Sequence, residues 1–213
     1  MGALLLAAGG EEPARHYDLL LAAHDYGALA TQLKHGMETP DLIRPTLAWE
    51  QQRVAAGGSI FVSAMYALDL LAAGRTAAES RENAVIMALY TIAAIETDGA
   101  KCADPAPAGA RRRQFARILA PVWGELRKLP DEGLARDLAR ALAQERTGAD
   151  GRPPDDYLCR GRTTDIPDGL ADAATEQTPH FAPREDWIPR QVAARSQLPA
   201  ALAEFAARLK RGV

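Results

Sequence analysis

Two long stretches of this chain carry no charged side chain, and they constrain the fold more than any other feature. They extend over residues 54–68 and 84–95. A helix that is apolar on all sides is buried within a bundle of other helices. Twelve residues are too few to span a bilayer, so 84–95 is not a membrane span. We therefore expect a buried core pair in which Tyr90 and Ile92 are inaccessible to solvent.

Helix start and stop signals place the two core helices near residues 59–73 and 77–97. Ser59 is a suitable N-cap, and Thr76 with Glu79 forms a capping box. Other capped or amphipathic segments predict helices that surround the core pair. These are 14–35 with a break between Asp25 and Gly27, 39–56, 111–129 interrupted at Pro121, a helix from Asp131, 184–194 and 198–209.

The predicted fold is all-α. A chain of 213 residues is long enough for one well-buried domain and short for two. We expect a single-domain irregular helical bundle over residues 11–213, with about seven or eight helices. Residues 148–180 have no periodicity and are rich in Gly, Pro, Asp and Thr, which predicts one long loop of the kind that is either functional or disordered.

The chain has two cysteines, Cys102 and Cys159, and both stand in polar, turn-forming segments. A free cysteine behaves as a small hydrophobe and is usually buried in an apolar element. Two lone cysteines in loops, with helical sequence between them, therefore predict one disulfide. A structural disulfide persists in an oxidising compartment, which favours a periplasmic or secreted protein.

The N-terminal segment supports the same localisation. Residues 1–10 are an apolar run that ends in small residues, and Glu11-Glu12-Pro13 follows directly. This pattern is typical of the end of a secretory signal peptide, although the basic region that should precede it is missing. We interpret 1–10 as a signal-peptide remnant whose natural start lies upstream; the alternative is an apolar tail or the beginning of the first helix.

Several function classes lack a signal in the sequence. A net charge of −3 with intermixed signs predicts no nucleic-acid partner and no anionic membrane surface. The four histidines are not at metal-ligand spacing, and no cysteine pair is. No nucleophile elbow, phosphate-binding loop or dinucleotide fingerprint occurs, and Gly57-Gly58 is better explained as a helix break. We therefore expect no metal and no cofactor.

The charged residues around the cysteines are the candidate functional face. A disulfide would bring carboxylates and guanidinium groups from distant parts of the chain onto one surface. Such a face could bind a protein partner, hold calcium, or supply a general acid and base for glycoside cleavage; most mixed charges in loops are solvated decoration. The predicted binding residues are Asp98, Asp104, Arg111, Arg112, Arg113, Asp155, Asp156 and Arg160.

The functional prediction is an exported helical protein that acts by binding another protein, for example an envelope adaptor or a toxin-immunity protein. The sequence favours this class over an enzyme because no catalytic signature is present. The alternative is an enzyme that cleaves cell-wall glycan with carboxylates near Cys102. An enzyme should place its acids in a concave cleft with a raised pKa, whereas a binder should expose a complementary patch. A homo-oligomer is a third option.

Overall fold

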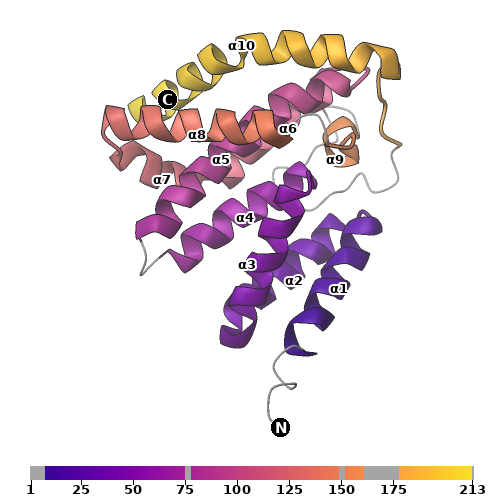
Figure 1. Ribbon diagram of the computed structural model, residues 1–213, viewed down its shortest axis with the longest axis vertical. Coiled ribbons are helices and arrows are strands. Elements are labelled where there is room, and N and C mark those ends of the chain that lie inside the picture. Colours follow the sequence, from indigo (N-terminus) through magenta and orange to yellow (C-terminus); the bar gives the residue numbers. More distant parts are fainter. Residues whose placement is uncertain (1–7, 75–77, 149–151, 161–177, 213) are drawn as a thin grey trace.

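The computed structural model describes residues 8–74, 78–148, 152–160 and 178–212, and within these ranges it is helical without a β-strand. The protein is all-α, as predicted, and it carries more helices than the seven or eight expected (Figure 1). The helices are α1 (Ala8–Ala22), α2 (Tyr26–Glu38), α3 (Pro40–Ala55), α4 (Ile60–Ala73), α5 (Ala78–Asp98), α6 (Ala106–Ile118), α7 (Ala120–Lys128), α8 (Asp131–Gly148), α9 (Asp156–Cys159) and α10 (Arg184–Arg211), with a 3-10 turn η1 (Gly99–Lys101) after α5.

Helices α4 and α5 form the core pair. Ser59 caps α4, because its Oγ accepts a hydrogen bond from the Phe61 amide at 3.2 Å. Every residue from 84 to 95 is buried, including Tyr90 and Ile92, so the burial predicted for this charge-free stretch is confirmed. The other helices pack around the pair: α6, α7, α8 and α10 against α5, and α2 and α3 against α4.

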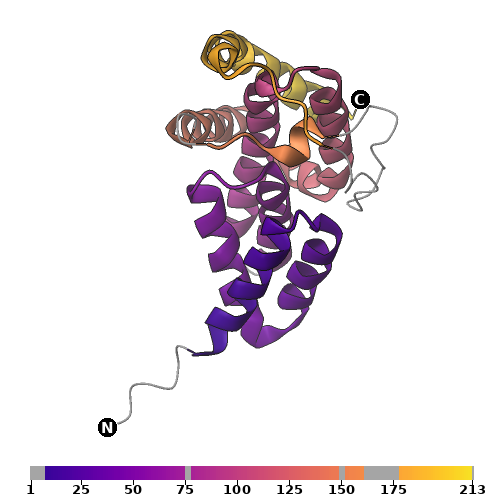
Figure 2. The ribbon, with the colours of Figure 1, turned by 90° about the vertical axis from the view of Figure 1, so that its right-hand side faces the viewer.

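The two ends of the molecule contain different helices. In both views α1, α2 and α3 lie together at one end, and α10 lies at the opposite end (Figures 1 and 2). The core pair connects these ends, because α4 packs on α3 while α5 packs on α10. No helix within the described ranges combines the length and the apolar character needed to cross a membrane.

The predicted breaks between helices occur where the sequence indicated them. Helix α1 ends at Ala22. Asp25 then caps the start of α2 by accepting a hydrogen bond from the Ala28 amide at 3.0 Å. The 111–129 segment divides at Leu119, so that Pro121 lies in the first turn of α7, where its missing N–H leaves no intrahelical bond unmade.

The C-terminal segment differs from the prediction of two helices at 184–194 and 198–209. It is one helix, α10, which continues through Pro189 and Pro199. Both prolines are exposed. The carbonyls that a proline leaves without an intrahelical donor can therefore bond to water on the solvent-facing side, so the helix does not have to end there.

The predicted disulfide between Cys102 and Cys159 is confirmed, with Cα atoms 5.2 Å apart. It joins the end of η1 to the end of α9. Backbone hydrogen bonds add a third segment, because His180 donates to Cys159 and accepts from Ala103. Of the predicted long loop at 148–180, residues 149–151 and 161–177 lie outside the described residues, as do residues 1–7 of the predicted signal remnant.

Candidate functional site

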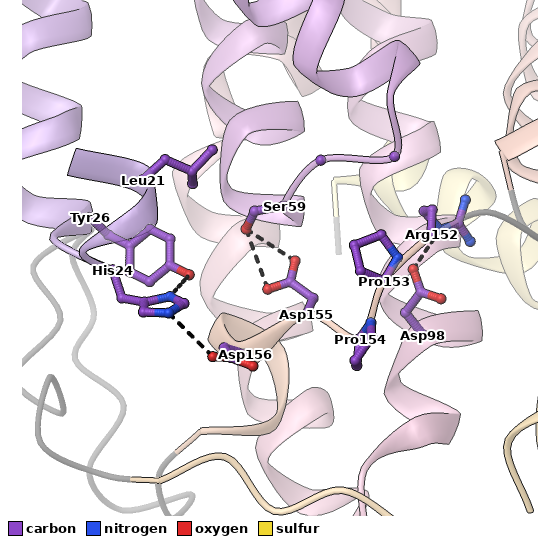
Figure 3. Close-up of a pocket in the computed structure, with 12 residues that line it drawn as sticks. Leu21, His24, Tyr26, Ser59, Asp98, Arg152, Pro153, Pro154, Asp155 and Asp156 are labelled. Carbon is purple, nitrogen blue, oxygen red and sulfur yellow. Dashed lines mark hydrogen bonds and ion pairs between the residues drawn. The ribbon is translucent and has the colours of Figure 1, made fainter. Parts of the chain in front are cut away.

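A pocket of about 360 Å³ lies beside the disulfide-linked segment (Figure 3). Four parts of the chain line it: the end of α1 with the turn into α2, the link that precedes α4, the segment 152–156 that leads into α9, and the end of α5. The lining residues are Leu21, His24, Tyr26, Gly57, Gly58, Ser59, Asp98, Arg152, Pro153, Pro154, Asp155 and Asp156. Three of the eight predicted binding residues, Asp98, Asp155 and Asp156, are therefore brought together here.

Gly57 lets the second and third of these parts, the link before α4 and the 152–156 segment, lie close to each other. Its φ is +75°, a left-handed conformation that glycine adopts without steric cost. A Cβ at this position would also lie 3.0 Å from a side-chain carbon of Arg152. The Gly57-Gly58 pair thus ends α3, as expected of a helix break, and allows the 152–156 segment to approach α4.

Asp155 holds two helix starts together. Its carboxylate caps α9 by accepting from the Tyr157 amide at 2.9 Å, and it also accepts from the Ile60 amide at 2.6 Å and from the Ser59 hydroxyl at 3.1 Å. Burial raises the pKa of Asp155, while the bonds from Ile60 and Ser59 act in the opposite direction. These contacts give Asp155 a structural role at the first turn of α4, where a negative charge is also favoured by the helix dipole.

His24 connects Asp156 to Tyr26 at the mouth of the pocket (Figure 3). Its Nε2 lies 3.4 Å from Asp156 Oδ2, and its Nδ1 lies 3.3 Å from the Tyr26 hydroxyl. His24 has a φ of +55°, which is uncommon for a residue other than glycine and recurs at functional sites. The histidine and aspartate side chains remain 41% and 30% exposed, so both can contact a partner.

The Tyr26 ring belongs to a buried aromatic cluster beneath this mouth. Its centroid lies 5.0 Å from that of Phe61 and 4.6 Å from that of Tyr157. Burial, and then the charge of Asp155, raise the pKa of Tyr26 well above its usual value. The hydroxyl is therefore neutral at physiological pH, which makes it a hydrogen-bonding group rather than a nucleophile.

Arg152 closes the other side of the pocket inside a buried ionic network. Its Nε lies 2.6 Å from Asp98 Oδ2, and its Nη2 lies 2.8 Å from Glu145 Oε1. Lys101 Nζ lies 3.0 Å from Asp98 Oδ1, and Arg195 Nε lies 3.4 Å from Glu145 Oε1. Burial alone would lower the pKa of Arg152, but the charge of Asp98 and the bonds to Glu145 outweigh it and raise this pKa.

The eight predicted binding residues fall into an enclosed and an exposed group. Asp98 and Arg111 are buried, Arg160 is buried beside Asp156, and Asp155 is the helix cap described above. Arg111 donates to the backbone carbonyl of Tyr157 at 3.0 Å, and its guanidinium carbon lies 4.0 Å from the centre of the Tyr157 aromatic ring. The more accessible residues are Asp104, which caps α6, Arg112, which pairs with Glu96, Arg113, and Asp156. Their role in binding stays a prediction.

The contacts of the polar side chains in and near the pocket bear on the enzyme alternative. Among the described side chains, the Ser59 hydroxyl is bonded to Asp155 and not to an imidazole. Of the acids that flank Cys102, Asp98 lines the pocket and is already bonded to Arg152, while Glu96 is paired with Arg112 elsewhere. The part of the chain that the structure describes contains no cluster of three or more His, Cys, Asp or Glu placed to hold a metal ion.

Sequence reasoning missed His24, Tyr26 and Ser59 as pocket residues. In the sequence, His24 is one of four histidines without metal-ligand spacing, and no local pattern links it to Asp156, which is far away along the chain. The break signal at Asp25 and the cap at Ser59 were recognised, but only as helix boundaries. No known protein family, curated protein or solved structure matches this chain.

Proposed function

We propose that this chain is an exported protein that binds another protein, and that a basic side chain of the partner enters the pocket beside α9. The observation that carries the proposal is the state of Asp156 at the mouth. Its carboxylate is 30% exposed, and its two basic neighbours, His24 and Arg160, lie 3.4 Å and 3.7 Å away. Asp156 therefore retains acceptor capacity that a partner's ammonium or guanidinium group can use.

Rigidity at the pocket supports recognition. The segment that carries Asp156 is fixed by the Cys102–Cys159 disulfide and by the bonds of Asp155 to α4. Loops become effective binding sites when a scaffold holds them in place, because less conformational entropy is lost when the partner binds. The geometry therefore favours a preformed recognition site.

Partner capture from the envelope fraction of the source cell tests the binding proposal. We expect Asp156→Asn to reduce capture at least about tenfold, the loss expected for one charge-assisted hydrogen bond. Glu132→Gln, an exposed acid on α8, is the matched control and should leave capture unchanged. The variant Asp155→Asn is a poor probe, because it removes the cap that two helices share.

A paired replacement of Arg112 and Arg113 by Gln tests the other accessible part of the predicted face. Loss of capture in this variant, with Asp156→Asn behaving as wild type, would move the binding site to α6 and overturn the pocket proposal. For export, we expect intact mass to show a disulfide in protein taken from the source cell. Two free thiols there would contradict the proposed compartment.

A further inference from the structure

Two further buried acidic residues lie at the end of the α4–α5 pair that is farther from the disulfide. Asp69 is the one charged residue in α4, and it is 7% exposed. Glu50 on α3 is fully buried. Burial, then the charge of Asp69 and a hydrogen bond with it, raise the pKa of Glu50 well above its usual value. The two carboxyl groups therefore form a close pair.

Among the described residues, no cation forms an ion pair with either carboxyl group. The two oxygens of Glu50 and Oδ2 of Asp69 are buried there and receive no hydrogen bond from another described group. Two carboxylates cannot donate to each other, whereas one shared proton supplies the missing bond. Burial accordingly raises the pKa of Asp69 to about 7. An acid placed like this is costly unless something positive compensates it.

Asp69 forms part of the wall of a pocket of about 620 Å³ between α2, α3 and α4. This volume lies within the usual range for small-molecule sites. The remaining wall is largely apolar, with Met37, Ile43, Met65 and Leu68 contributing large side chains. Met side chains adapt to ligands of different shape, which suits an apolar tail.

None of the described charged or titratable groups around the pair neutralises its negative charge. Lys34 lies on α2 at the pocket edge, 74% exposed and 3.7 Å from Glu38. Tyr17 on α1 and Tyr66 on α4 face the pair as neutral hydroxyls, because burial and the charge of Glu50 raise the pKa of both. No described cation is paired with Glu50 or Asp69.

We propose that this pocket binds an ammonium ion that carries an apolar tail, with the ammonium against Asp69 and the tail along the Met65 and Leu68 wall. The ammonium supplies the positive charge that the carboxyl pair lacks. The tail is removed from water by the apolar wall. Because the ammonium replaces the shared proton, binding releases a proton to the buffer.

The experiment is calorimetric titration of the full chain with octylamine, and with octan-1-ol and octanoate as probes of equal tail length. We expect octylamine to bind at least about tenfold more tightly than octan-1-ol, and octanoate to bind more weakly still. The heat of octylamine binding at pH 7 should vary with the ionisation enthalpy of the buffer, because a proton is released.

Two variants and one control locate the site. Asp69→Asn should reduce octylamine affinity at least about tenfold and remove the buffer dependence, while octan-1-ol binding is retained. Ala72→Trp, at an exposed position in the pocket wall, should weaken both ligands by filling the space. Glu132→Gln, an exposed acid on α8 that does not line this pocket, is the control and should leave affinity within about twofold.

Equal affinity for octylamine and octan-1-ol would overturn the proposal, and so would octylamine binding that is insensitive to Asp69→Asn and Ala72→Trp. This result is independent of the protein-binding pocket beside α9, because the two sites lie at opposite ends of the core pair. Failure of partner capture with Asp156→Asn leaves the octylamine result unaffected, and the converse also holds.

Discussion

The two ends of the α4–α5 pair both bury acidic side chains, but they compensate them differently. At the end beside the disulfide, Asp98 and Glu145 meet the guanidinium of Arg152 at 2.6 Å and 2.8 Å. At the opposite end, Glu50 and Asp69 face each other without a described cation. The first cluster contains its own cations, although Glu145 Oε2 and Arg195 Nη2 have no hydrogen-bond partner among the described residues, whereas the second requires a proton or an external positive charge.

This difference gives the two clusters different roles: the Arg152 cluster is structural, whereas the Glu50–Asp69 pair is a candidate binding site. A buried ion pair contributes little net stability compared with apolar residues, yet removal of one partner is strongly destabilising. The Arg152 network therefore enforces one arrangement of α5, α8 and α10 around the pocket beside α9. An uncompensated carboxyl pair lowers stability at neutral pH, and such a cost is typical of functional sites.

The largest effect is expected from Arg152→Met, which removes the one described cation that contacts both acids of the Asp98–Glu145 cluster. Asp98 and Glu145 then remain buried without their guanidinium partner, and the free energy of unfolding should fall by about 3–5 kcal/mol. Urea denaturation at pH 7 measures this. A loss below about 1 kcal/mol would show that Lys101 and Arg195 compensate the acids without Arg152, and the contrast between the two ends would weaken.

The next effect concerns the disulfide that closes the compensated end. Replacement of both Cys102 and Cys159 by Ser should lower the free energy of unfolding by about 2–4 kcal/mol, since the closed loop spans 57 positions. Comparison of urea denaturation of this variant with that of the oxidised wild-type protein provides the measurement, and the reduced wild-type protein is the control that should match the variant. If the Arg152 network alone fixes the segment, the change will be too small to resolve.

Much of this comparison could be foreseen from the sequence, but not its central contacts. The charge-free stretch 84–95 predicted the core helix, and the loop setting of the cysteines predicted the disulfide. Asp69, the one charge in an otherwise apolar helix, was a readable signal that went unused. Which acid meets Arg152 depends on packing between segments 54 positions apart, and local patterns carry no information about such contacts.

The exposed and enclosed parts of the predicted binding face show the same limitation. Composition identified a region rich in Asp and Arg around the cysteines, and three of those residues do line one pocket. Composition could not show that Arg111 is buried against Tyr157 or that Asp155 caps two helices. Burial of a charged side chain is a property of the assembled fold.

The pH dependence of stability tests the uncompensated end. The pKa of Asp69 is about 7 in the folded protein against 3.8 ordinarily, so the folded state binds more protons than the unfolded state between these values. Stability relative to Asp69→Asn should therefore fall as pH rises from about 4 to about 7, by about 3 kcal/mol. Urea denaturation of both proteins at several pH values measures the difference.

In Asp69→Asn the side-chain amide can donate to Glu50, so the variant should fold and lose this slope. Any remaining slope common to both proteins belongs to other groups. Parallel curves for wild type and variant would contradict a shared proton, because Asp69 would then add nothing to the titration of Glu50 and other groups. The opposite slope would require a folded-state pKa below the ordinary value.

The smallest effect comes from an ion pair that matches the Arg152 pair in length but not in burial. Arg112 Nη1 lies 2.6 Å from Glu96 Oε1, the same distance as Arg152 Nε from Asp98 Oδ2, and Glu96 and Asp98 are two residues apart on α5. The Arg112 pair is 40% and 34% exposed, whereas both side chains of the Arg152 pair are 2% exposed. Water can therefore solvate either member of the exposed pair once its partner is gone.

We expect Arg112→Met to change the free energy of unfolding by less than about 1 kcal/mol. Exposed ion pairs are screened by solvent and salt, and the carboxylate of Glu96 stays hydrated after its partner is removed. The identical substitution at Arg152 makes the two measurements directly comparable, and denaturation in low and high salt distinguishes them further. Salt should reduce the small Arg112 effect and leave most of the Arg152 effect, since buried pairs are screened less. Similar losses at both positions would mean that pair distance, rather than burial, controls the energetics at this end of α5, and the comparison with Glu50 and Asp69 would then lose its physical basis.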